Sequence, residues 1–255
     1  MDIVCDTNIW YELGTGELKP SQLPAGNLVA TFYNFEELTT SPNIVDSFPL
    51  VLGAAKAIVK FSKKQILDNA FLHIAKTVDP HFEDRTYSYN LGMQNWGEIR
   101  AIAAQSDSFT LTPHLKAEYQ KNIVNRVTQS TAVAQIENQF VTSVRAHSQQ
   151  LRKVDEKKYF KERFDGIVFE LNDYFKLFTQ GRLAIPRSKL TEFELFLTAF
   201  LQFARNTEIA KWVVQPNDSY DLYNLIYVRP GDKYFTKENR WKNLITEAGL
   251  SHYLA

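Results

Sequence analysis

Short apolar runs that end in polar residues lie at both ends of this chain, and they determine where a β-sheet can form. Residues 2–5 are mostly apolar and lead directly into Asp6, while residues 28–35 are rich in β-branched and aromatic side chains and lead into Glu36. Both patterns predict buried strands. A third short strand is expected at 233–235, so the first and last parts of the chain would build the sheet together.

Helical patterns fill the region between these strands. Apolar residues recur at helical spacing over 50–77, which predicts one amphipathic helix, and residues 96–207 predict several more. Residues 80–95 are rich in turn-forming and aromatic side chains. A short helix at 218–228 and a last helix that starts near Lys237 are expected close to the C-terminus.

This order of elements predicts an α/β protein in which a parallel sheet is flanked by helices and interrupted by a large helical insertion. We expect residues 1–50 and 210–255 to form the α/β core. Residues 51–209 would form a mostly helical segment that packs on the core or is inserted in it. The chain has 255 residues, of which 44% are hydrophobic, and this is enough for a substantial core.

The cysteine content and the hydropathy indicate the cellular compartment in which the protein is expected. The chain has one cysteine, so an internal disulfide framework is excluded and a reducing environment is expected. No stretch approaches the roughly 20 apolar residues that span a bilayer, and no basic leader precedes an apolar segment. We therefore expect a soluble, cytoplasmic protein with no membrane partner.

Charge is distributed unevenly, although the formal net charge is zero. Residues 1–50 hold seven acidic residues against one basic residue, whereas residues 116–163 hold ten basic residues against five acidic ones. An acidic end and a basic middle are typical of a cation site beside a surface that holds phosphate. The alternative is that the long helices simply carry solvated charges.

Acidic residues fall at four boundaries between predicted elements: Asp6, the pair Glu36 and Glu37, the pair Asp218 and Asp221, and Glu238. Neighbouring strands lie about 4.8 Å apart, so carboxylates at the ends of parallel neighbours converge within reach of one divalent ion. Mg²⁺ prefers such oxygen ligands, and a crowded carboxylate cluster is unfavourable without a cation. Each site has an alternative, because acids are ordinary at helix starts, where they act as caps.

Three segments carry these acids: "IVCDTNIW", "ATFYNFEEL" and "NDSYDLYNLIYVRPGDKYFTKENRW". In this order they resemble the PIN-domain family of metal-dependent ribonucleases, over roughly residues 1–45 and 214–250. The resemblance matches the four acids of the family to Asp6, Glu37, Asp221 and Glu238, and its orienting polar residues to Asn8 and Thr236. Asp218 is an additional carboxylate near the third acid.

The resemblance implies a metal-dependent endoribonuclease that hydrolyses the phosphodiester bonds of RNA with Mg²⁺ or Mn²⁺. Asp6 and Asp221 would be the main metal ligands, and Glu37, Glu238 and Asp218 would hold metal or metal-bound water. The chain departs from the family in carrying Glu238 where Asp is usual. It also has about 180 residues, mostly helical in pattern, between the second and third acids.

Basic residues of the helical segment are candidates for contact with the RNA backbone, since such contacts supply affinity that is independent of sequence. They are Lys116, Lys121, Arg126, Arg145, Arg152 and Lys153. Trp241 lies near the predicted site in sequence, either to stack on a base or, as is commoner for aromatic residues, to pack in the core.

Two other functions remain open. The chain could be a catalytically inactive PIN-like interaction module, in which the helical segment binds a partner. It could also be a mainly helical scaffold whose acids only cap helices. A protein inhibitor or another protein partner is compatible with both the ribonuclease and the inactive module. A homo-oligomer is compatible with both as well.

Overall fold

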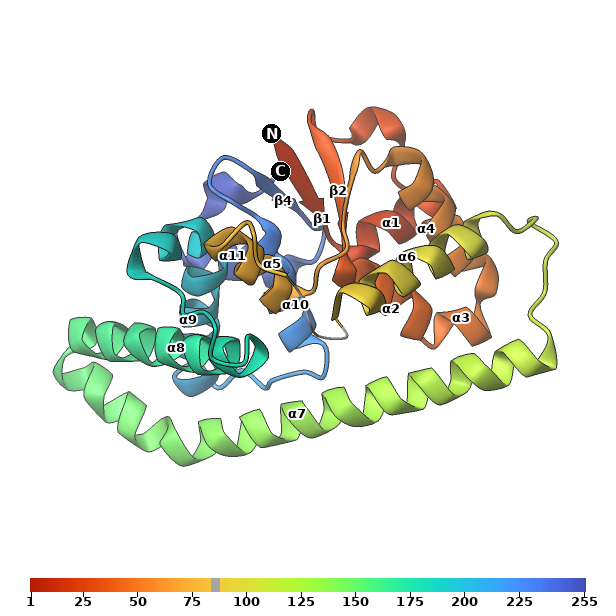
Figure 1. Ribbon diagram of the computed structural model, residues 1–255. Helices are drawn as coiled ribbons and strands as arrows, with labels where there is room; N and C mark the ends of the chain where they lie inside the picture. Colours follow the sequence, from red (N-terminus) through yellow and green to blue (C-terminus); the bar gives the residue numbers. More distant parts are fainter. Residues whose placement is uncertain (84–87) are drawn as a thin grey trace.

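The structure is a computed structural model that describes residues 1–83 and 88–255, without the side chains of residues 88 and 89. Within these residues, four parallel strands form one sheet (Figure 1). They are β1 (Asp2–Cys5), β2 (Asn27–Thr31), β3 (Lys64–Ile66) and β4 (Lys233–Phe235). Their order across the sheet is β3-β2-β1-β4. The expectation that the first, second and last predicted strands are parallel neighbours is therefore confirmed.

Helices cover both faces of this sheet. The first face carries α1 (Thr7–Thr15), α2 (Phe32–Thr40), α3 (Asn43–Asp46), α4 (Phe48–Phe61) and α6 (Ser88–Ala103). The second face carries α5 (Ala70–Val78), α8 (Glu156–Phe178), α9 (Glu194–Glu208), α10 (Asp218–Asn224) and α11 (Asn239–Glu247). In the described part of the chain, no helix combines the length and the apolar composition that crossing a membrane requires.

The central strands divide their side chains between two hydrophobic cores. Ile3 and Cys5 of β1 belong to the core on the first face, while Val4, between them, belongs to the core on the second face. This division follows from the alternation of side chains along a strand. Because both faces are covered, the middle residues of the two central strands are all apolar, as is typical of parallel sheets. Cys5 is fully buried, and its thiol donates to the carbonyl of Ile3.

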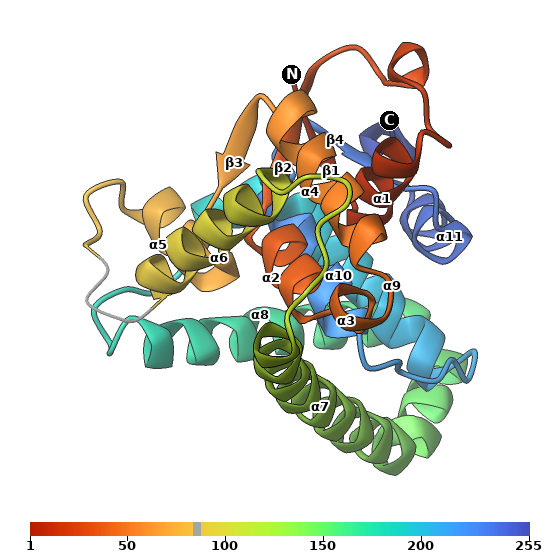
Figure 2. The same ribbon diagram turned by 90° about the vertical axis from the view of Figure 1, so that its right-hand side faces the viewer.

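The longest helix, α7 (Pro113–Val154), crosses the molecule below the carboxyl ends of the strands (Figures 1 and 2). Its 42 residues span about 63 Å at the usual rise per residue. Hydrogen bonds at several points along its length hold it to the rest of the protein. Arg126 donates to Thr40 of α2, Asn138 exchanges two hydrogen bonds with the backbone of Val214, and Arg145 donates to the carbonyl of Thr207.

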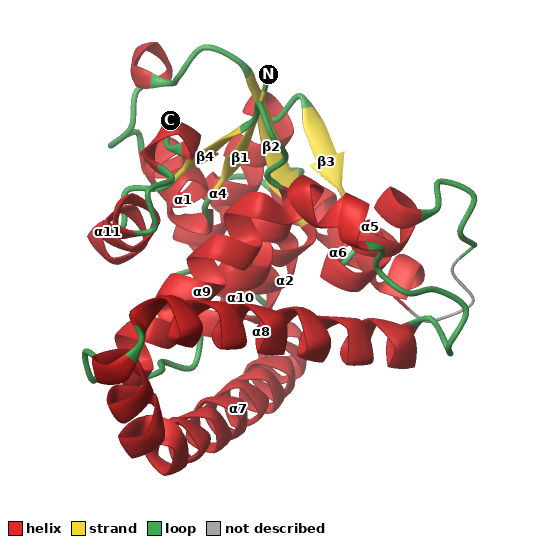
Figure 3. Ribbon diagram, turned by 90° about the vertical axis from the view of Figure 1, so that its left-hand side faces the viewer, coloured by secondary structure: helices red, strands yellow, loops and turns green. Residues whose placement is uncertain are grey.

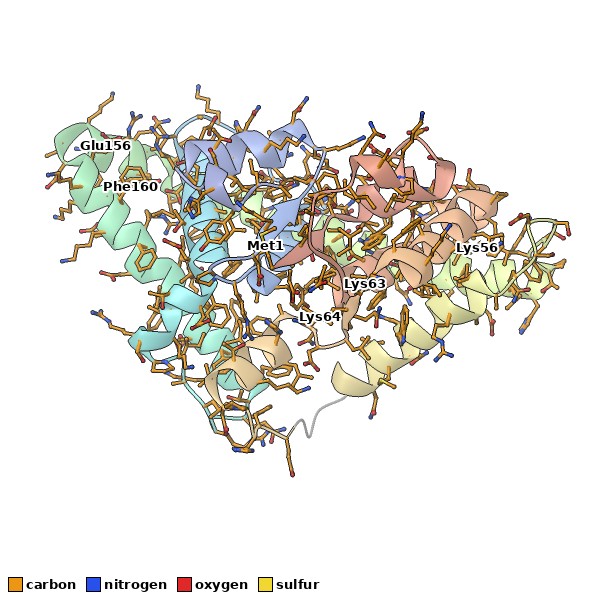
Figure 4. All side chains as sticks on the ribbon, turned by 90° about the horizontal axis from the view of Figure 1, so that it is seen from above. Met1, Lys56, Lys63, Lys64, Glu156 and Phe160 are labelled. Carbon is orange, nitrogen blue, oxygen red and sulfur yellow. The ribbon has the colours of Figure 1, made fainter. Side chains whose placement is uncertain are left out.

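Helix α8 turns back beside α7, and the two helices form an arm under the second core (Figure 3). Seen from above in Figure 4, Glu156 and Phe160 at the start of α8 lie on the opposite side of the molecule from Lys56 of α4, and Met1 lies between them. The arm therefore extends well beyond the small sheet.

Two predicted elements are wrong in detail. The helix expected over 50–77 is instead α4, strand β3 and α5, so residues 64–66 belong to the sheet. The strand expected over 28–35 ends at Thr31, because Thr31 and Asn34 form a capping box that starts α2. Of the turn-rich stretch expected over 80–95, the part from residue 88 onward is helical, and residues 84–87 lie outside the described residues.

Candidate functional site

The candidate site lies at the carboxyl ends of β1 and β4. The chain passes from β1 to β2 and β3 on one side, and it returns to form β4 on the other side of β1. Open α/β sheets bind ligands in the crevice where the strand order reverses in this way. Asp6 follows β1 directly, and Thr236 and Glu238 follow β4.

Asp6 is buried at this crevice and is held by the neighbouring strand. Its backbone N–H donates to the carbonyl of Phe235 (2.9 Å), and the Thr236 hydroxyl donates to its Oδ2 (2.7 Å). Asp6 occupies the N-cap position of α1, yet its side chain does not cap the helix. Burial raises the pKa of Asp6 to about 7, and the charges of Glu238 and Glu37 add to this rise.

Thr236 connects Asp6 to the fourth acid of the site. Its Oγ1 accepts a hydrogen bond from the backbone N–H of Glu238 (3.1 Å) while it donates to Asp6. The side-chain amide of Asn8 donates to Oε1 of Glu238. Burial raises the pKa of Glu238 and the charge of Glu37 raises it further, whereas the Asn8 hydrogen bond lowers it. The amide of Asn8 therefore contacts Glu238, and the hydroxyl of Thr236 contacts Asp6.

Asp221 reaches the same crevice from the first turn of α10. Its Oδ2 accepts a hydrogen bond from the indole N–H of Trp241 (3.2 Å). Burial raises its pKa well above the usual range, and the charges of Asp6, Glu37 and Glu238 raise it further. The four predicted acids therefore form one electrostatic cluster, although they come from four separate segments of the chain. Within the described residues, no lysine or arginine forms an ion pair with any of the four.

Asp218, the additional carboxylate, is occupied by other partners. Its Oδ2 accepts hydrogen bonds from Arg240 (2.6 Å) and from the backbone of Gln215 (2.7 Å). Burial raises the pKa of Asp218, and these two partners oppose the rise. Asp218 contributes negative charge beside Asp221, but its carboxylate belongs to an ion pair that joins α10 to α11.

The side chains of the candidate site offer carboxylate oxygens, the type of ligand that hard divalent cations prefer. Among the described residues, no three His, Cys, Asp or Glu side chains are grouped as ligands of a single metal ion. Mg²⁺ commonly uses only one or two carboxylates and completes its shell with water and substrate phosphate. Asp6 and Asp221 offer oxygen ligands of this kind. Burial, and then the charges of the neighbouring acids, raise the pKa of Asp221, and a bound cation would offset both effects.

All six basic residues predicted to contact nucleic acid lie on α7, but their surroundings differ. Arg126 donates to the carbonyl of Glu37 and covers the ring of Tyr220 at 4.8 Å, so it lies beside the acidic cluster. Arg145 is tied to α9, and Arg152 pairs with Glu156. The three lysines Lys116, Lys121 and Lys153 are exposed.

Three further residues contact the site, and of these only Trp241 is named in the sequence analysis. Arg240 and Trp241 bind Asp218 and Asp221 from α11, and buried Asn34 bonds the carbonyl of Cys5 and the hydroxyl of Thr7 beneath the site. The pattern Thr-x-x-Asn at the end of β2 indicates the capping role of Asn34. No comparable signal in the sequence points to Arg240 or to the hydrogen bond between Trp241 and Asp221.

Comparison with known proteins finds no matching family model, no matching curated protein and no matching solved structure. The chemistry of the site is therefore interpreted from its own residues.

Proposed function

We propose that this protein is a PIN-like, metal-dependent endoribonuclease that cleaves RNA at the Asp6 site. One observation carries the proposal. Asp6 follows β1 and Glu238 follows β4, and their charges, together with that of Glu37, add to the burial that raises the pKa of Asp221. Such a cluster is costly unless a cation or a proton compensates it. The order of the acidic segments along the chain, and their resemblance to the PIN-domain family, also support this function.

Helix capping does not explain the cluster. Asp6 and Glu238 stand at the N-cap positions of α1 and α11, but neither side chain bonds to the helix that it precedes. Asp6 accepts instead from Thr236, and Glu238 accepts from Asn8. The third possibility, a helical scaffold whose acids only cap helices, is therefore disfavoured.

A bound Mg²⁺ or Mn²⁺ would lower the pKa of a water ligand and neutralise charge on the phosphate. Asp6 and Asp221 would hold the ion, since burial and neighbouring charges make both prefer a positive partner. Glu37 and Glu238 would accept protons from water and orient it. Thr236 and Asn8 would keep Asp6 and Glu238 in place through the hydrogen bonds described above.

RNA is the proposed substrate, with single-stranded DNA a weaker candidate. The exposed lysines of α7, Lys116, Lys121 and Lys153, would hold the backbone beyond the site, since such contacts depend on charge and not on sequence. In this proposal, residues 1–50 and 210–255, together with β3, form the PIN-like core, and the remaining helices form the insertion.

Cleavage of a labelled single-stranded RNA in the presence of Mn²⁺ tests the proposal. We expect Asp6→Asn, which keeps the size of the side chain, to reduce cleavage at least a hundredfold. Asp46→Asn is the matched control, because Asp46 is exposed on α3 and should leave the rate unchanged. Cleavage by Asp6→Asn at the rate of the parent would exclude Asp6 from catalysis.

A catalytically inactive PIN-like interaction module is the second candidate. It is favoured by the hydrogen bonds from Asn8 and Trp241, which occupy one carboxylate oxygen each of Glu238 and Asp221. Titration calorimetry with MnCl₂ separates the two functions. Binding that Asp6→Asn abolishes supports the nuclease, whereas the absence of binding together with the absence of cleavage supports the inactive module.

A further inference from the structure

A cavity of about 620 Å³ lies between α7, α8, α9 and α10. Aromatic side chains from α2, α5, α9 and α10 form much of its wall. They are Tyr33, Phe71, Phe196, Phe200, Tyr220 and Tyr223. Several of these rings pack on one another, with Tyr223 stacked on Tyr33 at 6.1 Å and on Phe196 at 6.3 Å between ring centres. The volume lies in the range of about 300–1,000 Å³ that is usual for binding sites.

The mouth of this cavity is apolar and open. Val133, Ile136 and Phe140 of α7 and Tyr174 of α8 line it, and all four are exposed, Ile136 to 66% and Tyr174 to 61%. We call these four side chains and the cavity that they border the α7–α8 groove. Exposed Leu177 lies one turn of α8 beyond Tyr174 and extends the apolar character along this helix. Apolar surface that is concentrated in this way usually marks an interaction site.

The charge around the groove is negative. Residues 127–144 of α7 contain a single charged residue, Glu137, and residues 164–178 of α8 contain three acids and one lysine. Glu137 and Glu170 both line the cavity. Burial raises the pKa of Glu137, and the charges of Asp218 and Glu170 raise it further. A positively charged group beside Glu137 would therefore stabilise its ionised form. Nucleic acid, whose backbone is negative, is disfavoured at this surface.

The α7 wall of the groove is held in place. Asn138, next to Glu137, donates to the carbonyl of Val214 and accepts from its N–H, both at 3.0 Å. At the other end of the groove, Arg126 donates to Thr40 at 2.9 Å. A preformed groove binds with a smaller loss of conformational entropy than one that must first be ordered.

We propose that the α7–α8 groove is a docking site for a segment of another protein that carries large apolar side chains beside lysine or arginine. An apolar or aromatic side chain of the segment enters the cavity, and its basic residues meet Glu137 and Glu170. A second copy of this chain is a poorer occupant, because it would bring the same acidic surface. The proposal goes beyond the nuclease function and does not depend on it.

Peptide selection on the full chain tests the proposal. Phage-displayed random peptides of 16 residues are selected on the immobilised protein, and the selected peptides are synthesised with a fluorophore. Their affinity is then measured by fluorescence anisotropy. We expect them to combine aromatic or leucine side chains with lysine or arginine. Ile136→Asp should weaken their binding at least tenfold, and Glu137→Lys combined with Glu170→Lys at least fivefold.

Two variants serve as matched controls. Val154→Asp introduces the same charge at an exposed apolar residue of α7 outside the groove, and Glu162→Lys reverses an exposed charge of α8 outside it. Both should bind like the parent, and thermal melts confirm that all variants fold.

Three results would overturn the proposal. The selection could return only acidic peptides or none, or the selected peptides could bind Ile136→Asp as well as the parent. Sedimentation velocity could also reveal a dimer that Ile136→Asp dissociates, which would make a second copy the occupant.

Discussion

At the scale of single residues, the candidate site depends on one side chain, Thr236, which forms hydrogen bonds to both Asp6 and Glu238. The Thr236 hydroxyl donates to Asp6 and accepts from the backbone of Glu238, so one side chain sets the positions of two acids. Groups that orient the ligands of a metal usually matter almost as much as the ligands themselves.

Thr236→Val keeps the shape of the side chain and removes both hydrogen bonds. We expect the rate of RNA cleavage and the affinity for Mn²⁺ to fall by about 10–100-fold, as is usual when such an orienting group is lost. Thr236→Ser, which retains the hydroxyl, should keep most of both. Cleavage and Mn²⁺ affinity that stay at the level of the parent in Thr236→Val would show that the hydroxyl is not needed.

His73 of α5 provides a prediction that is independent of the site. Burial lowers its pKa to about 3, and the charges of Arg229 and Lys64 lower it further. The unfolded chain, in which histidine has a pKa of about 6.5, therefore binds the proton more readily. As the pH falls below about 6.5, this residue reduces the free energy of unfolding by up to about 1.4 kcal/mol per pH unit, until the folded form titrates near pH 3.

His73→Phe should remove this contribution and flatten the dependence of stability on pH between pH 6 and 4, as urea unfolding would measure. His114→Phe is the control, because His114 is exposed on α7 and should leave the slope unchanged. Identical slopes for His73→Phe and the parent would contradict the assignment.

At the scale of elements, α1 and α4 cross at two glycines. A Cβ atom on Gly14 of α1 would lie 2.3 Å from the backbone carbon of Gly53 in α4, a distance at which atoms clash. Neither backbone can move without displacing its helix, so the close crossing requires glycine at position 14.

Gly14→Ala should therefore lower the free energy of unfolding by about 2–3 kcal/mol, the usual cost of overpacking. Gly97→Ala is the matched control in a helix, because nothing lies within 4 Å of a Cβ atom on Gly97 of α6. It should raise stability by about 0.5–1 kcal/mol, because alanine favours the helix. Chemical denaturation of both variants measures the difference, and equal effects would contradict the packing at the crossing.

The sequence allows β1 and β4 to be located because each is a short apolar run, but it does not allow β3 to be located. The three residues of β3 are partly exposed and include Lys64 and Gln65, and the strand pairs only with β2. Its place in the sheet therefore depends on β2 and not on its own pattern. The aromatic residues after Thr31 favour a strand, but the capping box formed with Asn34 favours a helix and prevails.

The sequence indicates the candidate acids because each stands at a predicted boundary between elements. Asp6 and Glu238 do follow strands, but Glu37 lies inside α2 and not at the end of a strand. Their partners could not be predicted. Arg240 binds Asp218, and Trp241 binds Asp221, only because α11 packs near α10. Contacts of this kind between residues about 20 positions apart depend on tertiary structure.

At the scale of the whole molecule, a buried polar network joins the α7–α8 arm to the second core. Glu208 of α9 is 1% exposed and binds Arg163 of α8 at 2.6 Å, Ser148 of α7 at 2.8 Å and Tyr159 of α8 at 3.2 Å. One carboxylate thus connects three helices.

Glu208→Ala leaves Arg163 without its carboxylate partner, and we expect a loss of about 3 kcal/mol in the free energy of unfolding. Glu208→Gln, which can still accept hydrogen bonds, should lose less. Glu162→Ala, which removes an exposed carboxylate that faces Lys158 on α8, should change stability by less than about 0.5 kcal/mol. Urea unfolding gives the comparison, and a loss for Glu208→Ala no larger than that for Glu162→Ala would contradict the role of the network.

Cys5, the only cysteine of the sequence, lies in β1, one residue before Asp6, and no part of it is exposed. Burial also raises the pKa of its thiol, so the reactive thiolate is scarce in the folded protein. An alkylating reagent can reach Cys5 only when the sheet opens beside the acids. The rate of alkylation therefore measures how often this strand becomes accessible to solvent. The measurement needs no engineered cysteine.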